Sequence, residues 1–221
     1  MKYPKNLRSL LVLFLLVGAV LSSCSKKREG KPKVLVFSKT AGYYHESIPQ
    51  GIAAIQKLGA ENGFDVDTTK NAELINEENL AQYATVIFLS TTGDVLNNYQ
   101  EADFERYVQS GGGFLGIHAA ADTEYDWGWY GRLVGGYFAD HPGIKDPHPN
   151  VQPGKVTKTG EKHPSVDFLP ESWTRTDEWY SYKKINPNTK KLLLLDESSY
   201  QGGMDMGEHP IAWYHDYDGG R

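Results

Sequence analysis

The chain lacks the cysteines that a disulfide framework or a cysteine hydrolase requires. Its 221 residues include a single cysteine, Cys24, so no intrachain disulfide can form. Thiolate chemistry needs a cysteine inside the catalytic cleft, whereas Cys24 follows an N-terminal apolar run. The chain also contains no GxSxG and no HExxH motif, the short signatures of many serine hydrolases and helix-borne zinc sites. These absences exclude an amidotransferase or a cysteine peptidase and give no support to serine hydrolysis.

An excess of positive charge is missing as well. The formal net charge is -5, and removal of residues 1–23, which carry three basic and no acidic side chains, would change it to -8. An acidic chain is a poor partner for nucleic acid or for an anionic membrane surface. We therefore expect no nucleic-acid partner and expect any membrane contact to come from a lipid.

The N-terminal segment predicts export. Three basic residues precede the apolar run Leu10 to Leu21, which is short for a transmembrane helix and typical of a secretory signal. The sequence Leu21-Ser22-Ser23-Cys24 is similar to a bacterial lipobox, which implies cleavage before Cys24 and acylation of its thiol. An ordinary signal peptide with a chance cysteine is the alternative. We expect a signal peptide over 1–23, a lipid-anchored polar tether over 24–32, and an outer membrane lipoprotein facing the periplasm or the cell surface.

The next part of the chain alternates strand and helix patterns. Short apolar, β-branched runs predict strands, and apolar spacing of three and four residues predicts helices between them. The expected strands are 33–38, 64–68, 85–90 and 113–118, and the expected helices are 47–62 and 99–109. This order predicts an α/β, flavodoxin-like, doubly wound and mostly parallel sheet. Ligands of such sheets bind beyond the carboxyl ends of the strands, which selects the loops after Ser38, Ser90 and Ile117.

The pattern changes in the second half. Residues 124–137 carry a helical apolar stripe, whereas 140–189 are rich in Pro, His, Gly and Trp with poor periodicity. We expect an insertion with little regular structure there, followed by strands at 190–195 and 210–214. Because no helix follows to cover the last strands, we expect the domain 33–221 to be truncated at its C-terminus.

His118 holds the most informative position in the sequence. It follows the expected fourth strand and is flanked by Gly116, Ala119 and Ala120, small residues of the kind that a sharp strand-to-helix turn needs. A histidine lifted into the cleft by such a turn can act as a base, a metal ligand or a hydrogen-bond donor. The alternative is a buried histidine that hydrogen-bonds to the backbone.

Four ordered motifs give the chain a family resemblance. They are residues 37–48 (FSKTAGYYHESI), 111–122 (GGGFLGIHAAAD), 177–180 (DEWY) and 209–213 (HPIAW). Together the motifs resemble those of ThuA-like (trehalose utilisation) proteins over residues 33–221. The resemblance implies a class I glutamine amidotransferase-like fold without its cysteine nucleophile, and a link to sugar metabolism. It also implies a further strand after the Gly-Gly-Arg turn at which this chain stops.

Two histidines are the main catalytic candidates. His45 follows the first strand and His118 the fourth, so both side chains can reach the same sheet edge. With a carboxylate they would suit a divalent transition metal, and without an ion they would suit general acid–base chemistry. The candidate carboxylates are Glu46, Asp122, Asp177 and Glu178. Neighbouring side chains of an extended segment point to opposite faces, so only one of Asp177 and Glu178 is expected in the cleft.

Aromatic residues suggest the ligand. All five tryptophans follow the fourth expected strand, and aromatic faces pack well on sugar rings. The alternative is that these rings only bury apolar area. We expect a substrate-binding set drawn from these aromatics, from the motifs of the resemblance and from the same sheet edge: Tyr180, Trp179, Trp127, Asp122, His141 and His209.

These observations predict an extracytoplasmic protein that acts on a carbohydrate or an oxidised (keto) sugar by hydrolysis, elimination or isomerisation. No cofactor is expected beyond a divalent metal at His45 and His118. Two alternatives stay open. One is a non-catalytic glycan-binding lipoprotein, and the other is a scaffold for a partner sugar oxidoreductase.

Overall fold

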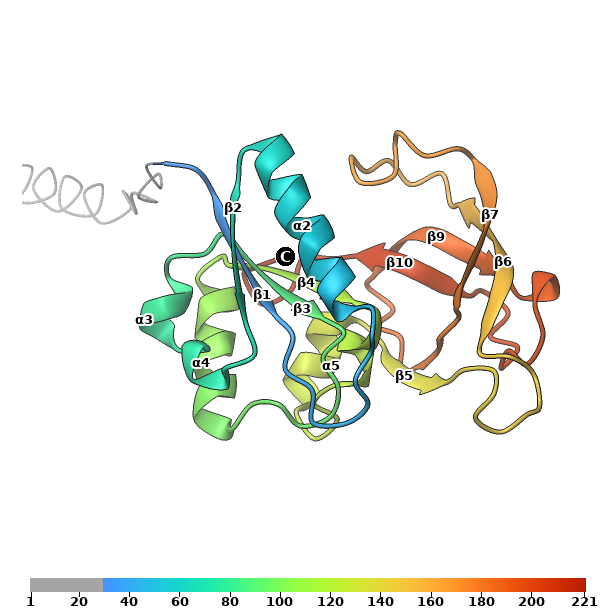
Figure 1. The fold of residues 1–221 in the computed structure, drawn as a ribbon, viewed down its shortest axis with the longest axis horizontal. Helices are drawn as coiled ribbons and strands as arrows, with labels where there is room; N and C mark the ends of the chain where they lie inside the picture. Colours follow the sequence, from blue (N-terminus) through green and yellow to red (C-terminus); the bar gives the residue numbers. More distant parts are fainter. Residues whose placement is uncertain (1–29) are drawn as a thin grey trace, which may run out of the picture. The chain divides into compact units, whose positions relative to one another are not determined.

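The protein is described by a computed structural model over residues 30–221. Its first sheet is entirely parallel, with strand order β2-β1-β3-β4 (Figure 1). The strands are β1 (Lys33–Phe37), β2 (Asp65–Thr69), β3 (Thr85–Leu89) and β4 (Gly113–Ile117). Each lies within one residue of its predicted bounds, and the predicted flavodoxin-like parallel sheet is confirmed.

Helices cover both faces of this sheet. Helix α2 (Ile48–Asn62) packs Ile55 against Val36 and Ile87 on one face. On the other face Phe88 meets residues of α4 (Asn98–Gln109) and α5 (Gly128–Val134), including Phe104 and Tyr130. Alternate side chains of each central strand thus enter different cores, and the doubly wound arrangement is confirmed.

Local sequence signals explain where the two long helices begin and end. Helix α2 has a proline in its first turn and stops at Gly63, which adopts a left-handed φ of 75°. Helix α4 begins with a capping box, in which Asn97 and Gln100 satisfy each other's backbone N–H groups. The helical elements between α2 and α4 in the chain are the short helix α3 (Glu77–Leu80) and the 3-10 turn η1 (Ala72–Leu74).

The second half contains more regular structure than the sequence suggested. Strands β6 (Val151–Lys158), β7 (Ser172–Glu178), β9 (Lys190–Asp196) and β10 (Pro210–Tyr214) form an antiparallel sheet of order β10-β9-β6-β7. A separate antiparallel pair joins β5 (Tyr137–Asp140) to β8 (Ser181–Lys183). The expectation of an irregular insertion over 140–189 was therefore wrong. Strand β6 shows why it was not predicted. Its buried positions include Gln152 and Gly154, so its sequence lacks the apolar alternation that indicates a strand.

The predicted signal peptide and Cys24 lie outside the described residues. Within 30–221, no helix is both long and apolar enough to cross a membrane.

Candidate functional site

The three loops that were expected to bind a ligand, after Ser38, Ser90 and Ile117, meet at the carboxyl edge of the parallel sheet. Thr40, after β1, bridges Thr92, after β3, and Gly93 in turn bridges Thr123, after β4. The Ala41 N–H donates to the Thr92 carbonyl over 2.7 Å. The loops thus continue the order of the strands beyond the sheet, and this places His45 beside the end of β4.

His118 stands at the sharp turn that the sequence predicted. It is the first residue of the 3-10 turn η2 (His118–Asp122), directly after β4, and its φ is 54°. A positive φ is uncommon for any residue with a Cβ and costs the folded state about 1 kcal/mol or more. The small neighbours are also explained, because a Cβ on Gly116 would lie 3.1 Å from the Cβ of Ala120. The backbone strain is concentrated at a residue whose side chain leaves the sheet.

Two imidazoles converge on one carboxylate oxygen. The Nε2 atom of His118 lies 2.9 Å from Oε2 of Glu178, and the Nε2 atom of His45 lies 3.5 Å from the same oxygen. The two rings meet edge to face with their centroids 4.6 Å apart. One potential ligand atom from each of these residues lies within 4.8 Å of the others. The predicted convergence of His45 and His118 is confirmed, and Glu178, at the end of β7, is the carboxylate that joins them.

His141 and Tyr180 complete what we call the histidine cluster: His45, His118, His141, Glu178 and Tyr180. The Nε2 atom of His141 lies 3.6 Å from Oε1 of Glu178. The Tyr180 hydroxyl lies 3.2 Å from Nε2 of His45, and its ring packs on His118 with centroids 4.3 Å apart. The four other side chains, from the segments that follow β1, β4, β5 and β7, therefore lie around the carboxylate of Glu178.

Burial alone would raise the pKa of Glu178, but its neighbours reverse that effect. Hydrogen bonds from His118 and His45, and the charges of His118 and His141, together hold the pKa of this carboxyl well below its usual range. Burial, followed by the negative charge of Glu178, raises the pKa of Tyr180 well above the usual value. At neutral pH the centre therefore presents an ionised carboxylate and a neutral phenol.

His45 is the least satisfied member of the cluster. Only 9% of the residue is exposed, and its Nδ1 atom is buried without a hydrogen-bond partner. Its Nε2 contact with Glu178, at 3.5 Å, is long for a hydrogen bond. By contrast, the side chain of His118 is 25% exposed and makes a normal hydrogen bond to Glu178. His118 is thus the imidazole of this pair that faces outward.

The three acidic candidates other than Glu178 lie outside the cluster, and Glu46 is exposed. Asp177 pairs with Arg175 at 2.7 Å, and 42% of its side chain is exposed. As expected for adjacent strand residues, Glu178 faces the cleft and Asp177 does not. Asp122 accepts a hydrogen bond of 2.5 Å from the Tyr125 hydroxyl and lies near enough to raise the pKa of Tyr180. Asp122 therefore borders the histidine cluster without joining it.

The two tryptophans predicted to hold substrate serve the cores. Trp127 is 8% exposed, stacks on Trp129 and donates its indole N–H to Glu105. Trp179 is 3% exposed and donates to the carbonyl of Gln152 within the second sheet. Their burial corresponds to the alternative interpretation, in which these rings bury apolar area. Sequence position alone did not separate the two roles, because Trp179 is adjacent in sequence to both Glu178 and Tyr180.

His209 supports the cluster from behind. It is 1% exposed, its Nδ1 lies 2.8 Å from Glu197, and its Nε2 lies 2.8 Å from the carbonyl oxygen of Tyr180. Each ring nitrogen of His209 thus has a hydrogen-bonding partner, one on Glu197 and one on the backbone of Tyr180. It therefore fixes the segment that carries Tyr180, although it was predicted to bind substrate directly.

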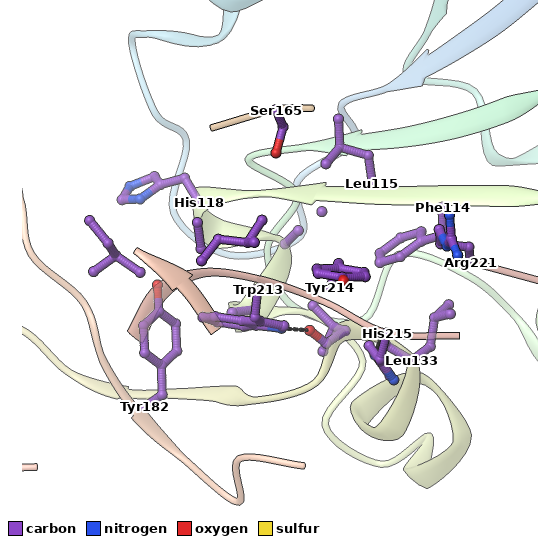
Figure 2. A pocket seen from close by; sticks show the side chains of 17 residues that line it. Phe114, Leu115, His118, Leu133, Ser165, Tyr182, Trp213, Tyr214, His215 and Arg221 are labelled. Atoms are coloured by element: carbon purple, nitrogen blue, oxygen red, sulfur yellow. Dashed lines mark hydrogen bonds between the residues drawn. The ribbon is translucent and has the colours of Figure 1, made fainter. Parts of the chain in front are cut away.

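A cavity of about 300 Å³ begins at His118 (Figure 2). Figure 2 shows His118 at one end, with Leu115 and Phe114 of β4 and Trp213 and Tyr214 of β10 along the walls. Most of the lining is apolar, and the hydroxyls of Tyr182 and Ser165 are among its few polar groups. His118 is the member of the histidine cluster that lines this cavity, so it connects the cluster to the cavity.

Sequence reasoning missed two neighbours of the cluster. The Asn150 amide donates to Oε1 of Glu178 over 2.9 Å, and the Phe138 ring packs on Tyr180 with centroids 4.3 Å apart. Asn150 lies in the turn before β6, within the segment read as irregular. Phe138, on β5, carries no polar group that would mark it.

Comparisons with known proteins agree with this architecture. The ThuA family model, described as trehalose utilisation, matches residues 33–221. A ThuA-like protein from Bacteroides uniformis has a similar solved structure, with a TM-score of 0.68 and 26% identity over 86% of this chain and 80% of that one. A ThuA-like protein from Parabacteroides merdae shares the fold, with a TM-score of 0.65 and 20% identity over 86% of this chain and 76% of that one.

No curated protein matches the chain. The family match nevertheless covers both sheets and every residue of the histidine cluster. The chain therefore belongs to the ThuA (trehalose utilisation) family.

Proposed function

We propose that the chain acts on a carbohydrate or oxidised-sugar derivative by proton transfer at the histidine cluster. The reaction class is hydrolysis, elimination or isomerisation, each of which needs a base that takes a proton and an acid that returns one. The observation that carries the proposal is the convergence of the His45 and His118 imidazoles on Glu178. The family's link to trehalose utilisation supports a sugar as the substrate.

His141 is oriented for a role as base. Its Nδ1 lies 2.8 Å from the carbonyl oxygen of Pro142, an acceptor, so Nδ1 carries the proton. In the neutral ring the lone pair is then on Nε2, which faces the cluster. His118, the outward-facing imidazole at the mouth of the cavity, is placed to meet the same substrate.

The N-terminal segment supports an extracytoplasmic place for this activity. A signal-like run followed by Cys24 is the arrangement of a lipid-anchored protein. Metabolic labelling with a radioactive fatty acid should mark the wild type and not Cys24→Ser. Equal labelling of both would remove the lipid anchor from the proposal.

Deuterium exchange tests the chemistry even before the full reaction is known. The full chain is incubated in D₂O with trehalose, glucose and their keto derivatives, and proton NMR follows exchange next to the carbonyl together with product formation. We expect the wild type to exchange or convert at least one keto sugar. His118→Ala, His141→Ala and Glu178→Gln should each lose a factor of about 100 or more.

Glu171→Gln is the matched control for Glu178→Gln, since Glu171 lies outside the cluster and 85% of its side chain is exposed. This variant should keep the wild-type rate. Wild-type rates in all three cluster variants would exclude the cluster as the catalytic centre. Tight sugar binding with neither exchange nor product would favour the glycan-binding alternative.

A further inference from the structure

Three side chains of the histidine cluster offer a donor set that metal ions use. His45, His118 and Glu178 come from the loop after β1, the end of β4 and the end of β7, and their ligand atoms lie within 4.8 Å of one another. Two imidazoles and one carboxylate bind Zn²⁺ in catalytic sites and Fe²⁺ in facial triads. Mg²⁺ and Ca²⁺ prefer sets made of oxygen atoms alone. From this geometry we infer that His45, His118 and Glu178 bind one divalent transition-metal ion.

The two separations measured from Oε2 of Glu178 match those of ligands on a common ion. Bonds of about 2.1 Å place two ligand atoms roughly 3.0 Å apart at a right angle and roughly 3.4 Å apart at the tetrahedral angle. Nε2 of His118 and Nε2 of His45 lie 2.9 and 3.5 Å from Oε2 of Glu178. The longer distance makes a poor hydrogen bond but fits two ligands of one ion.

Unmet bonding capacity in the cluster points the same way. His45 is nine-tenths buried, yet its Nε2 atom, the one that would bind the ion, has only long contacts, of 3.2 Å with Tyr180 and 3.5 Å with Glu178. The buried His209 offers a comparison within the same chain, because both of its ring nitrogens lie 2.8 Å from acceptors. A histidine that only supports the fold resembles His209, whereas His45 is left with capacity for a further partner.

An ion at this position would refine the proposed function, on which this part of the inference rests. It would polarise a sugar carbonyl or hydroxyl placed at the mouth of the cavity. With His45 and His118 occupied as ligands, His141 is the cluster imidazole with Nε2 available for proton transfer. Asn150, which donates to the other oxygen of Glu178, would hold the carboxylate in its ligating orientation.

Metal binding is measured directly and without any sugar. The full chain is treated with a chelator, dialysed and titrated calorimetrically with Zn²⁺, Co²⁺ and Mg²⁺. We expect one Zn²⁺ and one Co²⁺ per chain, no saturable Mg²⁺ binding, and a visible Co²⁺ spectrum typical of nitrogen and oxygen ligands. His45→Ala, His118→Gly and Glu178→Gln should each weaken Zn²⁺ at least 10-fold, whereas His163→Ala should bind as the wild type does.

His118→Gly keeps the experiment decisive if another variant fails to fold, because glycine accepts the positive φ at that position. Absence of saturable Zn²⁺ and Co²⁺ binding, or wild-type affinity in folded His118→Gly, would overturn the inference. Sugar turnover by the metal-free chain would overturn the ion's part in the reaction while leaving the proposed function standing. One-to-one binding that depends on the three residues, without turnover of any sugar, would support the metal site and count against the proposed function.

Discussion

Glu124 gives the protein a pH-dependent stability that one substitution should remove. Its carboxylate Oε1 accepts the backbone N–H groups of Val95 and Leu96 at 2.9 and 2.8 Å, and the residue is 3% exposed. Burial raises its pKa from an ordinary value near 4.5 to about 7, against the two backbone hydrogen bonds, and nearby Asp94 and Glu101 add to the rise. The folded state therefore holds this proton more tightly than the unfolded chain does.

The direction of the pH effect follows from that difference. Below about pH 4.5 the carboxyl is protonated in both states, and its contribution to folding is fully present. Between about pH 4.5 and 7 the unfolded chain releases the proton first, so the free energy of unfolding falls as pH rises. Holding the pKa at about 7 costs the folded state roughly 3 kcal/mol by pH 8, at about 1.4 kcal/mol for each tenfold change in proton affinity.

Glu124→Gln tests this reasoning. The amide oxygen can accept the same two N–H groups, and the side chain stays neutral at every pH. We expect wild type and variant to unfold at similar urea concentrations at pH 5. By pH 8 the variant should be more stable by roughly 3 kcal/mol, or about 6 to 12 °C in thermal midpoint.

The difference between the two proteins is the quantity to follow, because every other titratable group is common to both and its effect cancels. Glu171→Gln is the control, since 85% of that side chain is exposed, and its unfolding curve should follow the wild type at every pH. A gap between Glu124→Gln and wild type that stays constant from pH 5 to 8 would refute the argument.

Three further substitutions probe the site and its support. His118→Gly should abolish turnover yet fold more stably than His118→Val by about 1 kcal/mol or more, because valine tolerates the φ of 54° poorly; urea unfolding measures this. Trp127→Phe should lower stability by about 1–3 kcal/mol and leave sugar turnover unchanged, and a loss of turnover at equal stability would return Trp127 to the substrate site. His209→Leu leaves Glu197 and the Tyr180 carbonyl without their donor, so it should destabilise the chain by about 3 kcal/mol or more, which calorimetric melting would detect.

The parallel sheet was predictable because its strands are short apolar runs punctuated by clear helix signals. Val36 and Ile87 are buried on one face of the sheet, and Phe37 and Phe88 are buried on the other. Because both faces are covered, these strands need an apolar side chain at every position. Only half of the second sheet was predictable in this way, because β9 and β10 coincide with the strands expected at 190–195 and 210–214, whereas β6 and β7 were not expected. Strand β7 (SWTRTDE) has no fully buried residue, so its sequence carries almost no apolar signal.

The site was predictable to the extent that topology determines it. His45 and His118 follow strands of one parallel sheet, so topology places both at one sheet edge, although β3 lies between β1 and β4 and the loop that carries His45 must reach past it. The contact of these histidines with Glu178 depends on how the antiparallel sheet packs. From the sequence, the alternation of side chains along a strand predicted only that one of Asp177 and Glu178 would face the cleft. Asn150 and the cavity wall at Trp213 depend on the same packing, which no local pattern encodes.

The carboxylate at the centre comes from a different sheet than the two imidazoles that approach it. His45 and His118 are borne by the parallel sheet, whereas Glu178 ends a strand of the antiparallel one. The histidine cluster therefore exists only where the two sheets pack together and belongs to neither sheet separately. During synthesis His45 and His118 are made before Glu178, so the cluster can form only after β7 has been synthesised.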